Sequence, residues 1–93
     1  MSDSGNRFRL RLAGPAERRL AQLPKGVAAA VAEFMVGALL DAPQRVGRPL
    51  RNELSGLHAA RRGAYRVVYE IDEEAATVRV VRIDHRATVY RRR

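Results

Sequence analysis

The chain contains no cysteine and only two histidines, which excludes several kinds of site. Without cysteine, neither a disulfide framework nor a thiolate metal site can form. His58 and His85 lack the paired spacing of a metal motif, so we expect no metal and no cofactor. Long apolar runs are also absent, because the longest, Val27 to Leu40, is interrupted by Glu33 and is too short to span a bilayer. The first residues lack the apolar core of a signal peptide, and the expected location is the cytoplasm.

Acidic residues are scarce relative to basic ones, at 10 against 18, which gives a net charge of +8 and a pI near 11.4. Such a charge on a small domain favours an anionic partner: a nucleic acid, an acidic protein or a membrane surface. Arginine outnumbers lysine 17 to 1, and heavy use of alanine and valine indicates that a GC-rich coding sequence contributes to this bias. Charge therefore indicates an anionic partner without choosing among these three.

The spacing of apolar residues predicts the main elements. Residues 7–12 alternate between arginine and apolar side chains, the pattern of a strand with one solvated face. A first helix opens at Gly14-Pro15 and ends at Pro24. Residues 25–40 carry an apolar stripe typical of a second helix. Further along, two β segments joined through Gly63-Ala64 form a predicted hairpin.

Together these elements predict one α+β domain over residues 7–90. After the hairpin, residues 77–83 have high β propensity and complete an antiparallel sheet. We expect an N-terminal strand, a two-helix hairpin packed on an antiparallel sheet of about four strands, and a short C-terminal segment. Residues 1–6 are expected to be disordered and residues 91–93 to form a solvated basic tail.

Two groups of arginines are candidates for binding an anion. The first group lies in the predicted loop from Gln44 to Ser55, which contains three arginines spaced three residues apart: Arg45, Arg48 and Arg51. These arginines either contact backbone phosphates or belong to the ordinary solvated surface.

A second candidate is Arg66, which lies in the predicted strand from Tyr65 to Ile71. The alternate residues of this strand, starting with Tyr65, are predicted to face the core, and Arg66 lies on the opposite face. Either Arg66 pairs with a carboxylate such as Glu70 or Asp84, or it binds a phosphate bidentately.

A histidine, a guanidinium and a phenol follow the last predicted strand, as His85, Arg86 and Tyr90. The sequence has no Gly-rich phosphate loop, no nucleophilic cysteine and no carboxylate pair placed for acid–base work. Arginine, histidine and tyrosine suffice for metal-independent RNA cleavage by the substrate's own 2′-hydroxyl. In that reaction His85 or Tyr90 takes the hydroxyl proton, while Arg66 and Arg61 stabilise the charged phosphorane.

Two motifs of the chain resemble those of the RelE/ParE family of bacterial type II toxins. The segment LSGLHAARRGAYRVVYEID, residues 54–72, is similar to the family signature L-x-G-…-R-x-G-x-Y-R-V-x-Y. The ending HRATVYR, residues 85–91, is similar to the family's C-terminal H-R-x-x-x-Y. The likeness runs from about Arg7 to Tyr90, with the same order of strand, helical hairpin, arginine-rich loop and meander.

The resemblance implies one of two activities and a protein partner. RelE-type members cleave mRNA on the ribosome, whereas ParE-type members inhibit DNA gyrase. Both bind an antitoxin that wraps the toxin, and the complex typically represses its own operon by binding operator DNA. By position, Arg61 and Arg66 match the arginines around the family's hairpin. His85, Arg86 and Tyr90 match its C-terminal cluster, in which the tyrosine is often the proposed base.

One departure from the RelE pattern concerns the strand that enters the hairpin. Some RelE enzymes carry two lysines there, where this chain has Leu57, His58 and Ala59. His58 and the loop residues Arg48 and Arg51 are the candidates to replace them in binding RNA, together with Arg86.

Our leading hypothesis is a toxin that cleaves mRNA on the ribosome and is neutralised by an antitoxin. The alternatives are a gyrase inhibitor without nuclease chemistry and a basic module whose site residues are merely structural.

Overall fold

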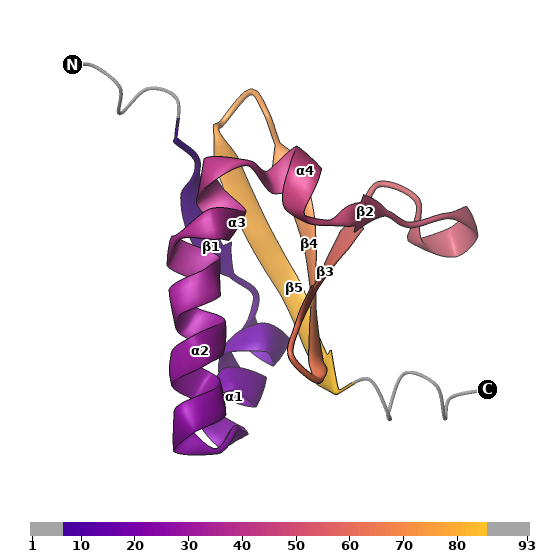
Figure 1. Cartoon of the computed structure of the whole chain (residues 1–93). Helices are drawn as coiled ribbons and strands as arrows, with labels where there is room; N and C mark the ends of the chain where they lie inside the picture. The colour runs from indigo at the N-terminus through magenta and orange to yellow at the C-terminus, as the bar shows by residue number, and fades with distance from the viewer. Residues whose placement is uncertain (1–6, 86–93) are drawn as a thin grey trace.

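The computed structural model describes residues 7–85, which form a two-layer α+β domain (Figure 1). The elements follow the chain in the order β1 (Arg9–Leu12), α1 (Gly14–Gln22), α2 (Lys25–Val36), α3 (Ala38–Asp41), α4 (Pro43–Val46), β2 (Arg48–Pro49), the 3₁₀ turn η2 (Asn52–Leu54), β3 (His58–Arg62), β4 (Tyr65–Asp72) and β5 (Thr77–His85). None of the helices in this part of the chain is long and apolar enough to cross a membrane. The predicted strand, helical hairpin and β-hairpin are all confirmed.

The sheet differs from the prediction in two respects. It has five strands in the order β1-β5-β4-β3-β2, and β1 runs parallel to β5 while the other pairs are antiparallel. The predicted antiparallel sheet of about four strands is confirmed by β2 to β5. The parallel pairing of the N-terminal strand was not predicted, because side-chain alternation does not encode the direction of a neighbouring strand. The fifth strand, Arg48–Pro49, was missed because two residues carry no periodicity.

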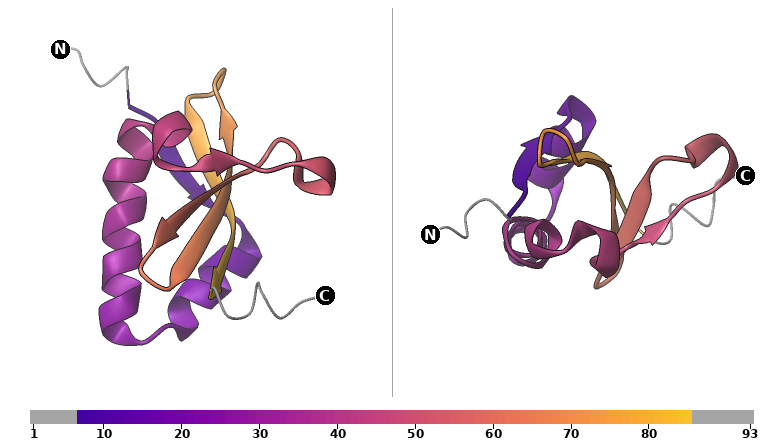
Figure 2. Two further views of the ribbon diagram at one scale, coloured as in Figure 1. Left: turned by 45° about the vertical axis from the view of Figure 1, so that its right-hand side comes forward. Right: turned by 90° about the horizontal axis from the view of Figure 1, so that it is seen from above.

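One face of the sheet packs on the helices, and among residues 7–85 none of the helices α1 to α4 packs on the other (Figure 2). The helix-facing side of β4 presents Val67 and Tyr69, both fully buried as predicted. Buried Val31 and Met35 come from α2 to meet them. The apolar residues of β1, Leu10 and Leu12, are the register partners of Val78 and Val80 and so lie on the same helix-facing side. The opposite side, called the open face below, receives the alternate residues of every strand.

The predicted second helix is broken at Gly37, where the backbone leaves helical geometry before α3 begins. Arg7 fastens the end of α2: its Nη2 donates to the Val36 carbonyl oxygen at 2.7 Å and its Nε to Asp41 Oδ1 at 2.8 Å. The prediction that residues 7, 9 and 11 form one solvated row holds for Arg9 and Arg11, which are exposed on the open face. Arg7 is also exposed, but it precedes β1 and binds the C-terminal end of α2, where a cation is favourable.

The turn between β4 and β5 contains a strained residue that offers a test of the fold. Ala76 has φ +51°, a left-handed conformation that costs an L-residue about 1 kcal/mol. Its carbonyl oxygen accepts a hydrogen bond from Arg9 N–H at 2.8 Å, so the turn also holds β1. We expect Ala76→Gly to raise the free energy of unfolding by about 0.5 kcal/mol, measured by urea titration. Ala75→Gly, one position earlier in the same turn, is the matched control and should not stabilise.

Candidate nucleic-acid interface

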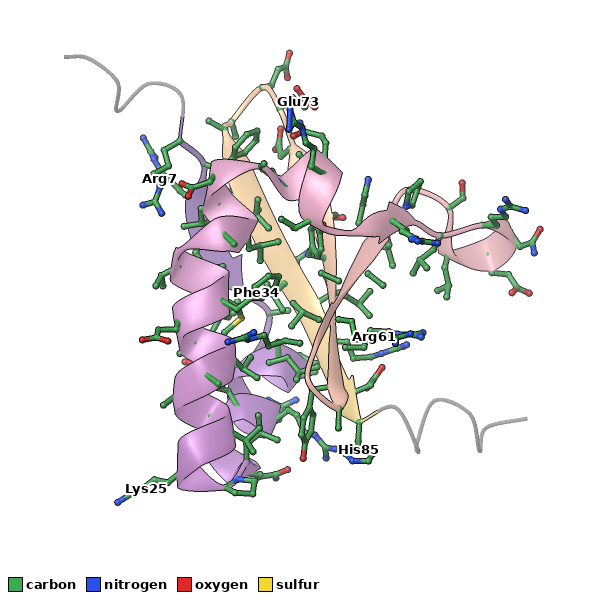
Figure 3. The ribbon with its side chains drawn as sticks, viewed as in Figure 1. Arg7, Lys25, Phe34, Arg61, Glu73 and His85 are labelled. Carbon is green, nitrogen blue, oxygen red and sulfur yellow. The ribbon has the colours of Figure 1, made fainter. Side chains whose placement is uncertain are left out.

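The hairpin of β3 and β4 places two arginines side by side on the open face. Arg61 and Arg66 are direct partners in the antiparallel register, and such partners project to the same side of a sheet. Figure 3 shows Arg61 extending from the sheet away from α2. Two like charges opposite each other destabilise a sheet unless an anion lies between them. Their pairing therefore indicates a site for an anion.

The short strand β2 supplies a third cation and the wall of a groove. Arg48 is the register partner of Ala59, which puts it on the open face beside the arginine pair. A groove of about 540 Å³ lies between this wall and the hairpin, and its lining residues are Val46, Gly47, Arg48, Leu50, Ala59, Ala60, Arg61 and Arg66. Among residues 7–85 the lining includes three cations and no acidic residue, so these residues give it a positive potential.

The three groove arginines form no ion pair within residues 7–85. The two carboxylates that the sequence offered to Arg66 are engaged elsewhere: Glu70 with Arg79 at 3.4 Å and Asp84 with Arg82 at 2.7 Å. In the part of the chain that the structure describes, the structural explanation of Arg66 is therefore wrong. Its planar guanidinium is free to take a phosphate by two parallel hydrogen bonds.

The remaining predicted residues are placed differently. His85 is the partner of Tyr65 and lies edge-on to its ring with 5.0 Å between centroids, on the side opposite Arg66. His58 stacks on Tyr69 at 5.6 Å, also facing the helices, and its Nδ1 is buried. Arg51 is exposed at the start of η2 and does not line the groove. The structure thus groups Arg48, Arg61 and Arg66 and separates them from both histidines.

Arg86 and Tyr90 lie outside the described residues. Within residues 7–85 there is no cluster of three or more histidine, aspartate or glutamate side chains that could hold a metal.

A buried tyrosine holds the wall of the groove, a role that the sequence did not reveal. The Tyr69 hydroxyl donates to the Pro43 carbonyl oxygen at 2.6 Å and so ties α4 to the sheet. Gly47, which follows α4, packs so closely on this hydroxyl and on the Ala59 carbonyl that it has no room for a side chain. Together these contacts fix the backbone that carries Arg48. The only feature of the local sequence that pointed to these close contacts was the glycine between α4 and β2.

Burial raises the pKa of Tyr69 from its ordinary value of 10.0 to about 12. Because the folded pKa is the higher one, the unfolded chain loses this proton first, and stability falls as the pH rises from 10 to 12. We expect this loss to reach roughly 2 kcal/mol in the free energy of unfolding by pH 11.5. Tyr69→Phe should be less stable by about 1 kcal/mol at pH 7 and should lack the alkaline decline. Denaturant titrations between pH 8 and 11.5 measure both, with Tyr65→Phe as a control that keeps the decline.

Comparison with known proteins places the chain in a family. The family model described as "ParE toxin of type II toxin-antitoxin system, parDE" matches residues 10–90. The chain is 51% identical to Toxin RelG of Mycobacterium tuberculosis over 85 residues, which is 91% of this chain and 98% of the relative. It is 47% identical to Toxin RelE of the same organism over 91 residues, which is 98% of this chain and 93% of that protein.

Solved structures agree with the sequence relationship. The toxin–antitoxin complex RelBE2 of M. tuberculosis contains a chain that superposes with a TM-score of 0.85 at 48% identity, covering 92% of this chain and 99% of that one. The Escherichia coli RelBE complex gives a TM-score of 0.72 at 20% identity over 84% of this chain and 95% of that one, a likeness of fold. The chain belongs to the RelE/ParE family of type II toxins.

Proposed function

We propose that this toxin is a ribosome-dependent mRNA endoribonuclease that attacks the RNA backbone through the substrate's 2′-hydroxyl and is neutralised by a cognate antitoxin. The observation that carries the proposal is the pair Arg61 and Arg66, directly opposed on a groove to which residues 7–85 contribute a third arginine and no acidic side chain. A scissile phosphate between these guanidinium groups would gain charge as the phosphorane forms, and preorganised cations stabilise that charge most strongly. The similarity to proteins named RelE and RelG supports this reading.

The proton transfers are assigned to the end of the chain. His85 faces the helix side of the sheet, against Tyr65, and we give it a supporting role. Tyr90 is then the proposed base, which takes the proton of the 2′-hydroxyl, and Arg86 is proposed to contact RNA. The 2′-oxygen bonds to phosphorus to give a 2′,3′-cyclic phosphate as the P–O5′ bond breaks, and the leaving 5′-oxygen takes a proton from solvent. A site that holds few catalytic groups fits a substrate positioned by the ribosome, because positioning alone supplies a large part of a rate enhancement.

The antitoxin is proposed by analogy with the relatives. The solved structures of the M. tuberculosis and E. coli relatives are toxin–antitoxin complexes. An antitoxin segment that covers the groove would neutralise the toxin by excluding RNA, and acidic side chains would complement its three arginines. We further propose that the complex binds operator DNA.

A second candidate function is inhibition of DNA gyrase, favoured by the family model that is described as a ParE toxin. Cell-free translation with mapping of mRNA 3′ ends separates the two. A nuclease produces new ends within the message, and these are lost in Tyr90→Phe and retained in Arg79→Ala, which removes an exposed arginine outside the groove. Intact mRNA together with accumulated gyrase–DNA breaks would contradict the nuclease and establish the alternative.

A further inference from the structure

On the open face, the carboxylate nearest to Arg66 in the sheet is bound by a different arginine. Asp84 is the direct register partner of Arg66, so their Cβ atoms are expected about 5 Å apart. The Asp84 carboxylate nevertheless accepts a hydrogen bond from Arg82 Nε at 2.7 Å. Arg82 and Asp84 are two positions apart on β5, which places both side chains on the same face as Arg66.

A β-bulge creates this arrangement. Tyr69 pairs with Val80, whereas Val68 pairs with Arg82, so Val81 is an extra residue in β5. Without it the alternation of β5 would continue from Val80 and would send Arg82 toward the helices. The bulge instead brings Arg82 and Asp84 to the open face and returns Ile83 to the core, where it is 2% exposed.

The pairing of Asp84 determines whether Arg66 can bind an anion. The Asp84 side chain is only 19% exposed, so its charge is poorly solvated and requires a cationic partner. If Arg82 were absent, Arg66 would still lie directly across the strand pair from Asp84, on the same face of the sheet. An Arg66–Asp84 ion pair would occupy the guanidinium and cancel the charge that a phosphate requires.

We propose that Arg82 is a positioning residue that sequesters Asp84 and thereby keeps the guanidinium of Arg66 open for an RNA phosphate. The inference rests on the proposed function for its ligand. Arg82 does not line the groove and acts only through Asp84. Its removal should therefore harm RNA binding by more than the loss of one surface charge, and removal of Asp84 should repair the harm.

The same strand provides a matched control. Arg79 lies on the same face of β5, its side chain is 51% exposed against 52% for Arg82, and it pairs with Glu70. The register partner of Glu70 is Arg79 itself, so freeing Glu70 does not place a carboxylate opposite Arg66. Arg79→Ala therefore reproduces the loss of charge without the proposed release of a carboxylate onto the site.

The first test measures affinity for a 2′-O-methyl RNA hexamer, which cannot be cleaved by 2′-hydroxyl attack, at low salt. We expect Arg82→Ala to weaken binding about tenfold and Arg79→Ala about two- to threefold, the latter from the general loss of positive charge. Asp84→Asn should bind at least as tightly as wild type. Arg82→Ala/Asp84→Asn should return to within about threefold of wild type, whereas Arg79→Ala/Glu70→Gln should show no comparable recovery.

The second test needs no RNA. The Nε–H NMR signal of Arg66 should move in Arg82→Ala and return toward its wild-type position in Arg82→Ala/Asp84→Asn. An unchanged signal, equal effects of Arg82→Ala and Arg79→Ala on affinity, or no rescue by Asp84→Asn would each overturn the inference. Failure of the proposed function is distinguishable, because it appears as intact mRNA in cell-free translation whatever the Arg66 signal does.

Discussion

Arg66→Ala is expected to lower the rate of mRNA cleavage on the ribosome by about 100-fold or more, the effect of removing one preorganised donor from a developing anion. Arg66 is one of three cations in the groove, and the structure gives it no ion pair within residues 7–85. Its removal therefore leaves no carboxylate without its partner. The free energy of unfolding should change by less than about 0.5 kcal/mol, so the loss of activity will not reflect unfolding.

Arg66→Lys separates charge from geometry. A lysine keeps the positive charge but lacks the planar fork that binds a phosphate through two parallel hydrogen bonds. We expect this variant to cleave about tenfold more slowly than wild type, between the wild type and the alanine variant. Quantified 3′ ends from single-round cell-free translation give the rates, with Arg79→Ala as a surface control that stays within about threefold. Equal cleavage rates for Arg66→Ala and Arg79→Ala would show that Arg66 does not contribute to the reaction.

Local pattern was sufficient to predict most of the fold. The alternation in residues 7–12 and from Tyr65 to Ile71 predicted strands and the face of each that enters the core, because a half-buried strand needs apolar residues at every second position. The helical hairpin was equally visible in its apolar stripe and prolines. The direction of β1 and the two-residue strand β2 were not visible, because pairing between distant segments leaves no periodic trace.

The candidate site was predicted only where its residues are close together in the sequence. Arg61 and Arg66 flank one tight turn, so a local reading was enough to place them together. The side on which His85 lies depends on the register of β5 against β4, and a shift of one residue moves every side chain to the other face. One signal for the register was present in the sequence: the adjacent Val80 and Val81 break the alternation at the bulge.

Gly47→Ala is expected to destabilise the groove wall, and with it the folded protein, more than any other variant considered. A Cβ at this position would overlap the Tyr69 hydroxyl oxygen and lie 2.8 Å from the Ala59 carbonyl oxygen. Neither neighbouring atom can move away easily, since the Tyr69 side chain is fully buried and the Ala59 carbonyl belongs to the backbone of β3. Overpacking of this kind costs about 1–3 kcal/mol, and loss of the hydroxyl bond to Pro43 adds about 1 kcal/mol. We therefore expect the free energy of unfolding to fall by about 3 kcal/mol.

Two further variants show whether the overlap is the cause. Gly26 belongs to α2, and a carbon added there would meet no atom within 4 Å beyond its chain neighbours and the backbone of its own helix. Gly26→Ala should therefore be neutral or more stable by up to about 1 kcal/mol. In a Tyr69→Phe background the hydroxyl is gone, so Gly47→Ala should cost less than it does in wild type. An undiminished cost in that background would place the strain elsewhere. Because Gly47 directly precedes Arg48, the variant should also weaken RNA binding by the protein that remains folded. The position of a groove cation therefore depends on the packing around one buried tyrosine.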